Sequence, residues 1–144
     1  MAKEQLIGVW QLVAVEARHS TGERFQIFGK NPTGMLMYTD SGYMSVLVSD
    51  PDRPAFAGGN LFEGTPDELQ AAFEGMSGYC GTYEVDEART EINHRLLSST
   101  FPGGEGTRLL RYYEFSDGRL IFKVPPTMIN GDEATVELIW ERVG

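Results

Sequence analysis

Two tryptophan motifs at opposite ends of the chain constrain its fold more than any other feature. Gly8-Val9-Trp10 lies near the start and Trp140-Glu141-Arg142 near the end, with hairpin-like strands between them. The two ends of an all-β chain meet when the sheet closes into a barrel. In such a barrel an indole can fill one end while a guanidinium stacks on it and bonds backbone carbonyls. We therefore predict a closed barrel that is blocked at one end.

The hydrophobic pattern predicts an all-β fold, a closed antiparallel up-and-down β-barrel of about eight strands. The clearest hairpin signal is Asp117-Gly118, and Asp40-Ser41-Gly42 marks a second turn. A barrel of this size has room for one small ligand. With 144 residues, we interpret residues 1–144 as a single domain. The expected strands cover residues 9–17, 34–39, 43–48, 81–85, 91–98, 108–116, 119–124 and 135–143.

One α-helix is expected in the middle of the chain, over residues 66–77. Thr65 is a good N-cap, Pro66 suits the first helical position, and Glu68 completes a capping box. Leu69, Phe73 and Met76 follow at helical spacing. We expect these three apolar side chains to pack against the barrel.

The hairpins predict which side chains face the inside of the barrel. A two-residue turn at Asp117-Gly118 places Tyr113 opposite Phe122, and the turn after Val85 places Tyr83 opposite His94. Both predicted inner faces are mostly apolar. The hairpin around Asp40 is ambiguous because both of its faces are apolar. We predict an apolar pocket whose ligand-binding residues are Tyr83, His94, Arg111, Tyr113 and Phe122.

Arg111 is the one fixed charge expected in this pocket. A buried guanidinium needs a partner, because an unpaired buried charge is costly. The alternatives are a carboxylate such as Glu16, expected on the inner face of the first strand, a phenolic oxygen, or an acidic group on a ligand. A structural ion pair, or a register that places Arg111 in solvent, is the competing interpretation. For His94, a neutral histidine satisfied by Tyr83 or backbone competes with acid–base work or a ligand hydrogen bond.

Six segments, taken in order, carry a resemblance to a known family. They are Leu6-Ile7-Gly8-Val9-Trp10-Gln11-Leu12-Val13, Gly34-Met35-Leu36-Met37-Tyr38-Thr39, Gly42-Tyr43-Met44-Ser45, Gly81-Thr82-Tyr83-Glu84-Val85, Arg111-Tyr112-Tyr113 and Trp140-Glu141-Arg142-Val143. Together they resemble the bacterial lipocalin-like domain family. The resemblance implies a calycin-type β-barrel around a ligand cavity. Some barrels of this general type, such as allene oxide cyclase, are enzymes, so the resemblance is compatible with either binding or catalysis.

The composition limits which binding partners and which cellular location are expected. The net charge is −9, with no basic patch, so neither nucleic acid nor an anionic membrane surface is expected. A single cysteine, Cys80, rules out an internal disulfide, and the sequence shows no signal peptide. We therefore expect a cytoplasmic protein. His19 and His94 lie far apart in sequence, and no motif for a metal, nucleotide or other cofactor is present, so none is expected. A homodimer is left open.

Three functions fit these features. The first is intracellular binding of a small, mostly hydrophobic molecule with a polar or acidic end. The second is a cofactor-free isomerase or cyclase acting on a polyketide-like or lipid-like substrate in the same cavity. The third is an interaction protein whose barrel is filled by its own side chains. We favour binding, because no complete catalytic constellation can be assigned.

Overall fold

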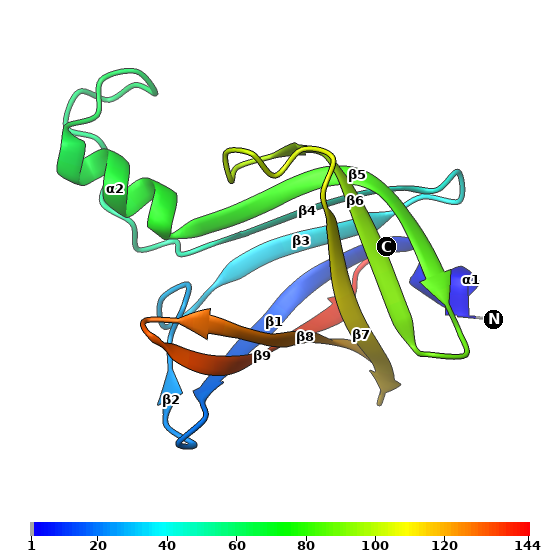
Figure 1. Cartoon of the computed structure of the whole chain (residues 1–144). Coiled ribbons are helices and arrows are strands. Elements are labelled where there is room, and N and C mark those ends of the chain that lie inside the picture. Colours follow the sequence, from blue (N-terminus) through cyan, green and yellow to red (C-terminus); the bar gives the residue numbers. More distant parts are fainter. Residues whose placement is uncertain (1) are drawn as a thin grey trace.

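The computed structural model describes residues 2–144, and it contains the expected closed barrel. The strands are β1 (Gly8–His19), β2 (Arg24–Phe25), β3 (Thr33–Tyr38), β4 (Tyr43–Ser49), β5 (Met76–Asp86), β6 (Glu91–Ser99), β7 (Arg108–Ser116), β8 (Arg119–Ile129) and β9 (Asp132–Arg142). Apart from the two-residue β2, each strand pairs antiparallel with the next along the chain, so β1 pairs with β3, and β1 also pairs with β9. Eight strands therefore close the barrel, with β2 as an extra strand beside β1 (Figure 1).

One end of the barrel is blocked by the two terminal motifs. Trp10 pairs with Arg142 across β1 and β9, and the guanidinium lies 4.4 Å from the centre of the Trp10 indole ring. A short helix not anticipated from the sequence, α1 (Ala2–Leu6), covers this end. Arg142 donates hydrogen bonds to the carbonyls of Ile7, at 2.8 Å, and of Gln5. We call Trp10, Arg142 and α1 the barrel floor.

Gly8 is required for this floor. Its φ is +130°, and a Cβ at this position would lie 2.5 Å from Nη1 of Arg142 and equally close to the carbonyl oxygen of Gly144. A larger residue would therefore face both an unfavourable backbone conformation and a clash. The glycine of the Gly-x-Trp motif leaves the space in which Arg142 reaches the backbone.

The two predicted hairpin registers are confirmed. Tyr113 pairs with Phe122 across β7 and β8, and Tyr83 pairs with His94 across β5 and β6. The hairpin that was ambiguous in sequence, β3–β4, places Leu36 and Tyr38 in the core. The alternate side chains on its outer face, Met35, Met37 and Leu47, are exposed.

The expectation for Glu16 is wrong. A β-bulge between Leu12 and Ala14 shifts the register of β1 against β9. Because a one-residue shift moves every following side chain to the other face, Val15 and Ala17 turn inward and Glu16 is exposed. Glu16 therefore cannot be the internal partner of Arg111.

The mid-chain helix is shorter than expected and does not pack on the barrel as predicted. Helix α2 (Pro66–Glu74) begins with the predicted capping box, in which Thr65 and Glu68 bond reciprocally. It ends at Gly75, so Met76 already belongs to β5. None of its residues is buried, and Leu69 and Phe73 remain about half exposed. In Figure 1 the helix extends away from the barrel at the end opposite α1.

Candidate functional site

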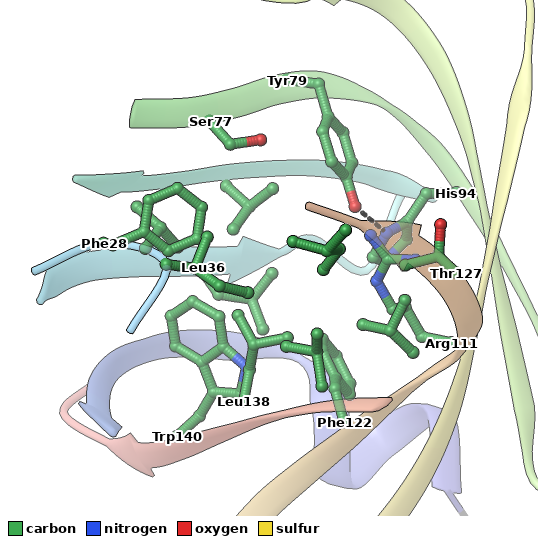
Figure 2. Close-up of a pocket in the computed structure, with 16 residues that line it drawn as sticks. Phe28, Leu36, Ser77, Tyr79, His94, Arg111, Phe122, Thr127, Leu138 and Trp140 are labelled. Carbon is green, nitrogen blue, oxygen red and sulfur yellow. Dashed lines mark hydrogen bonds between the residues drawn. The ribbon is translucent and has the colours of Figure 1, made fainter. Parts of the chain in front are cut away.

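The barrel encloses a cavity of about 210 Å³, so its own side chains do not fill it. Most of the wall is apolar, and the polar side chains are few. Two residues, Ile27 and Phe28, come from the connection between β2 and β3, and the others lie mainly on inward-facing positions of the strands (Figure 2). The lining consists of Ile27, Phe28, Leu36, Val46, Val48, Ser77, Tyr79, His94, Arg111, Phe122, Val124, Thr127, Ile129, Val136, Leu138 and Trp140.

Of the five residues predicted for the pocket, the cavity wall contains His94, Arg111 and Phe122. Tyr83 and Tyr113 face the core but lie outside the lining. The Tyr83 hydroxyl donates a 2.7 Å hydrogen bond to the carbonyl of Thr39, and the Tyr113 ring packs on Phe115. That any of the five binds a ligand stays a prediction.

A chain of three hydrogen-bonded side chains forms the polar part of the site. Nε2 of His94 lies 2.5 Å from the hydroxyl of Tyr38, and Nδ1 of His94 lies 2.7 Å from the hydroxyl of Tyr79. His94 is almost completely buried, and Phe122 contacts it edge-on. Figure 2 shows the Tyr79 hydroxyl beside His94 and close to the guanidinium of Arg111. We call Tyr38, His94, Tyr79 and Arg111 the polar cluster.

The environment fixes the charge states within this cluster. Burial, reinforced by the positive charge of Arg111, lowers the pKa of His94 from 6.5 to about 3. Burial raises the pKa of Tyr38 well above its ordinary value and also raises the pKa of Tyr79, although Arg111 opposes both shifts. Near neutral pH the cluster therefore consists of a neutral imidazole, two phenols and one guanidinium.

Arg111 has no anionic partner in the part of the chain that the structure describes. Its Nη1 donates a 2.9 Å hydrogen bond to the carbonyl of the adjacent Leu110, and none of the ion pairs among residues 2–144 involves it. The side chain is partly buried and lines the cavity. The guanidinium also lies within reach of the phenolic oxygen of Tyr79, which is one of the neutral partners expected for it. The site thus holds one cation with further N–H donors available to a ligand.

Sequence reasoning missed Tyr38 and Tyr79. Tyr38 was missed because both faces of the β3–β4 hairpin are apolar in sequence, so its inner face could not be assigned. Tyr79 was placed between the expected helix and the next strand, but β5 begins at Met76. In a strand every second side chain faces the same side. Because Tyr83 faces inward and β5 begins at Met76, counting back through Gly81 places Tyr79 on the inner face as well.

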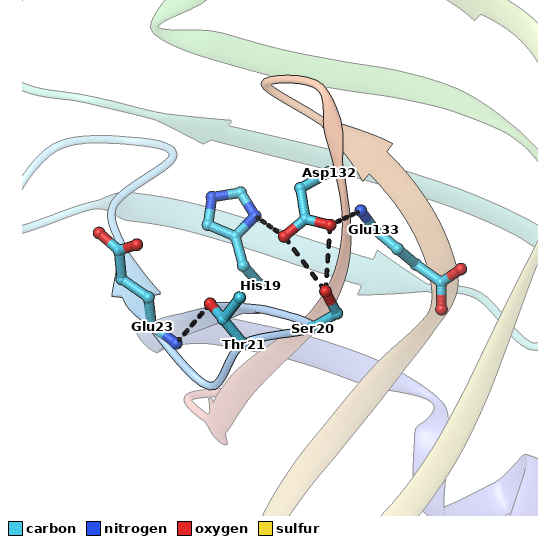
Figure 3. Close-up of polar contacts among 6 residues, drawn as sticks. All are labelled: His19, Ser20, Thr21, Glu23, Asp132 and Glu133. Atoms are coloured by element: carbon cyan, nitrogen blue, oxygen red, sulfur yellow. Dashed lines mark hydrogen bonds and ion pairs between the residues drawn. The ribbon is translucent and has the colours of Figure 1, made fainter.

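A second polar group ties loops together at the open end of the barrel (Figure 3). Ser20 donates a 3.0 Å hydrogen bond to Asp132, and Nδ1 of His19 lies 3.7 Å from the same carboxylate. The His19 ring stacks on Phe25. Because Ser20 bonds the carboxylate and not the imidazole, these side chains lack the serine–histidine contact of a nucleophilic triad. They join the β1–β2 turn to the β8–β9 hairpin.

Across residues 2–144 no three His, Cys, Asp or Glu side chains gather in a way that could hold a metal ion. Neither helix in this range combines the length and apolar character needed to cross a membrane.

Comparison with known proteins identifies the family. The model of the lipocalin-like domain matches residues 7–143, so the chain belongs to the lipocalin-like domain family. Among solved structures, a lipocalin-like protein from Bacteroides uniformis ATCC 8492 is similar, with a TM-score of 0.47 and 15% sequence identity. The match covers 96% of this chain and 99% of that one. A search of curated proteins found no match.

Proposed function

We propose that this protein binds a small, mostly hydrophobic molecule with an acidic group inside the barrel. The observation that carries the proposal is the cation of Arg111 in a largely apolar cavity without an internal carboxylate partner. A guanidinium that has lost water gains most from an anionic oxygen acceptor. A carboxylate, enolate or phenolate on the ligand would supply that acceptor.

The cavity limits the size and polarity of the ligand. A volume of about 210 Å³ fits a molecule of one or two fused rings or a medium-length chain. Leu138 and Trp140 form an apolar surface for its body, away from the polar cluster (Figure 2). Phe122 extends this surface to His94. The acidic end would then lie at Arg111 and Tyr79. The net charge of −9 supports a small-molecule partner over nucleic acid or an anionic membrane surface. The single cysteine is in keeping with the cytoplasm as the proposed location.

The alternative, a cofactor-free isomerase or cyclase, would use the same cavity, with Arg111 stabilising an enolate. Binding is favoured because His94 is poorly suited to general acid–base catalysis. Both of its ring nitrogens are bonded to tyrosines, and its pKa of about 3 leaves it a weak base near pH 7.

Replacing Arg111 by methionine should weaken binding of an aromatic carboxylate by about tenfold to a hundredfold. This range corresponds to the loss of about 1.5–3 kcal/mol for a hydrogen bond to a charged group. Calorimetric titration with 2-naphthoate, and with the neutral 2-naphthamide, measures the effect. The wild-type protein should prefer the carboxylate, and R111M should lose that preference.

The matched control is Arg108→Met, because Arg108 lies on the same strand but is exposed. R108M should bind 2-naphthoate like the wild-type protein. Equal loss in R108M and R111M would show that the acidic probe responds to overall charge and not to the cavity, and would contradict the proposal. Unchanged affinity in a folded R111M variant would contradict it as well.

A further inference from the structure

The proton positions in the polar cluster follow from a count of donors and acceptors. A neutral histidine has one N–H donor and one bare nitrogen acceptor, whereas each tyrosine hydroxyl can donate once and also accept. His94 is held between the hydroxyls of Tyr38 and Tyr79. Either ring nitrogen could therefore carry the proton. The two resulting tautomers give the hydrogen bonds to Tyr38 and Tyr79 opposite donor and acceptor roles.

Tyr38 decides between the two tautomers. Its side chain is only 2% exposed, and among residues 2–144 its hydroxyl has Nε2 of His94 as its single hydrogen-bond partner. If Nε2 carried the proton, the Tyr38 hydroxyl would accept it and its own proton would have no acceptor. A buried unsatisfied donor costs about 1–3 kcal/mol. Tyr38 therefore donates to Nε2, and the imidazole proton lies on Nδ1.

This tautomer leaves the proton of Tyr79 free. Nδ1–H of His94 donates to the Tyr79 oxygen at 2.7 Å, so Tyr79 does not need to donate to His94. Tyr79 lines the cavity, and Figure 2 shows its hydroxyl near the Arg111 guanidinium. The neighbouring cation cannot accept a hydrogen bond. The hydroxyl proton of Tyr79 is thus available to a bound molecule.

We infer that the chain from Tyr38 through His94 to Tyr79 makes Tyr79 a second donor beside Arg111, so that the cavity holds a two-donor site for an oxyanion. The inference rests on the proposed function and adds the specificity of the site. A carboxylate, with two acceptor oxygens, can bond both donors. An amine or a donating amide nitrogen would meet donors on both sides and would be disfavoured. Tyr38, which lies outside the cavity lining, acts as a positioning residue.

The tautomer of His94 tests the hydrogen-bonded series Tyr38–His94–Tyr79 in the absence of any ligand. In the full-length protein with ¹⁵N-labelled histidine at pH 7, long-range ¹H–¹⁵N correlation spectra distinguish a protonated Nδ1 from a protonated Nε2. We expect His94 to be neutral, with the proton on Nδ1. A proton on Nε2 would overturn the inference whatever the protein binds, because Tyr79 would then donate to His94.

Three tyrosine variants test the consequence for binding. Tyr79→Phe removes the donor and should weaken 2-naphthoate binding about tenfold or more. Tyr38→Phe removes the constraint on the tautomer and should weaken binding by roughly threefold to tenfold, with a change in the His94 nitrogen signals. Tyr112→Phe is the control. Tyr112 is adjacent to Arg111 on β7, but its side chain is exposed on the outer face of the barrel.

We expect Y112F to keep wild-type affinity and the wild-type tautomer. Equal effects of Y38F and Y112F, or none in Y79F, would overturn the inference. The outcomes separate it from the proposed function. If 2-naphthoate binds in an Arg111-dependent way but Nε2 carries the proton, only the inference fails. If 2-naphthoate does not bind in the cavity at all, the proposed function fails and the two-donor site fails with it.

Discussion

Replacing Trp10 by alanine should lower the free energy of unfolding by about 3–5 kcal/mol, the range for large aromatic side chains removed from cores. The Trp10 side chain is 2% exposed, and its indole nitrogen donates a 2.9 Å hydrogen bond to the carbonyl of Leu6 in α1. The variant would lose the apolar contacts, that hydrogen bond and the surface on which Arg142 stacks. Urea denaturation at pH 7 measures the loss.

The matched control is Phe62→Ala. Phe62 is also a large aromatic residue, but its side chain is 91% exposed in the connection before α2. Its removal should change stability by less than about 0.5 kcal/mol, as is usual for surface positions. A loss of less than about 1 kcal/mol in W10A would show that Trp10 does not form the barrel floor.

The second large effect concerns pH and His94. In the unfolded chain this histidine binds a proton near pH 6.5, but in the folded protein its pKa is about 3. Below pH 6.5 the unfolded state therefore binds more protons, and stability falls as the pH falls, until the folded pKa is reached. The slope approaches about 1.4 kcal/mol per pH unit, so this one residue should cost roughly 2 kcal/mol between pH 7 and pH 5.

Denaturation of the wild-type protein and His94→Gln at several pH values from 7 to 5 isolates this contribution. Glutamine can still bond both tyrosines but does not titrate, so H94Q should lose clearly less stability over that range. His19→Gln is the control, because His19 lies at the open end of the barrel beside Asp132 and not in the cavity. If H94Q and the wild-type protein show the same slope, His94 is not held neutral by burial.

The parts of the fold that sequence reasoning predicted well are those fixed by short-range chemistry. A two-residue turn sets the register of its hairpin, so Tyr113 opposite Phe122 could be derived from Asp117-Gly118 alone. The capping residues likewise placed the start of α2. The closure of the barrel was inferred from the pairing of Trp10 with Arg142.

The predictions failed where a one-residue register shift or a long-range contact decides which way a side chain faces or what it packs against. The bulge after Leu12 reversed the orientation of Glu16, and the alternation of residue types does not reveal such a bulge. The apolar spacing of Leu69 and Phe73 predicts a packed helix, but whether a partner surface lies nearby depends on the tertiary arrangement.

The site residues likewise divide into those predicted from a local turn and those missed because they depend on long-range contacts. Arg111 and His94 were predicted because each lies on a strand whose register a hairpin defines. Tyr38 and Tyr79 were missed because the faces of β3 and the start of β5 depend on neighbouring strands. Their bonds to His94 join strands β3, β5 and β6, and contacts of that kind are set by closure of the whole barrel.

Binding in the cavity can be located directly by NMR titration of the ¹⁵N-labelled protein with 2-naphthoate. The two indole N–H groups are internal reporters, because Trp140 lines the cavity whereas Trp10 is bonded to Leu6 in the floor. We predict saturable shifts of the Arg111 side-chain Nε–H and of the Trp140 indole, with little change at Trp10 or Arg108. Shifts confined to the outer face, or none at Arg111 and Trp140 at saturation, would contradict binding in the cavity.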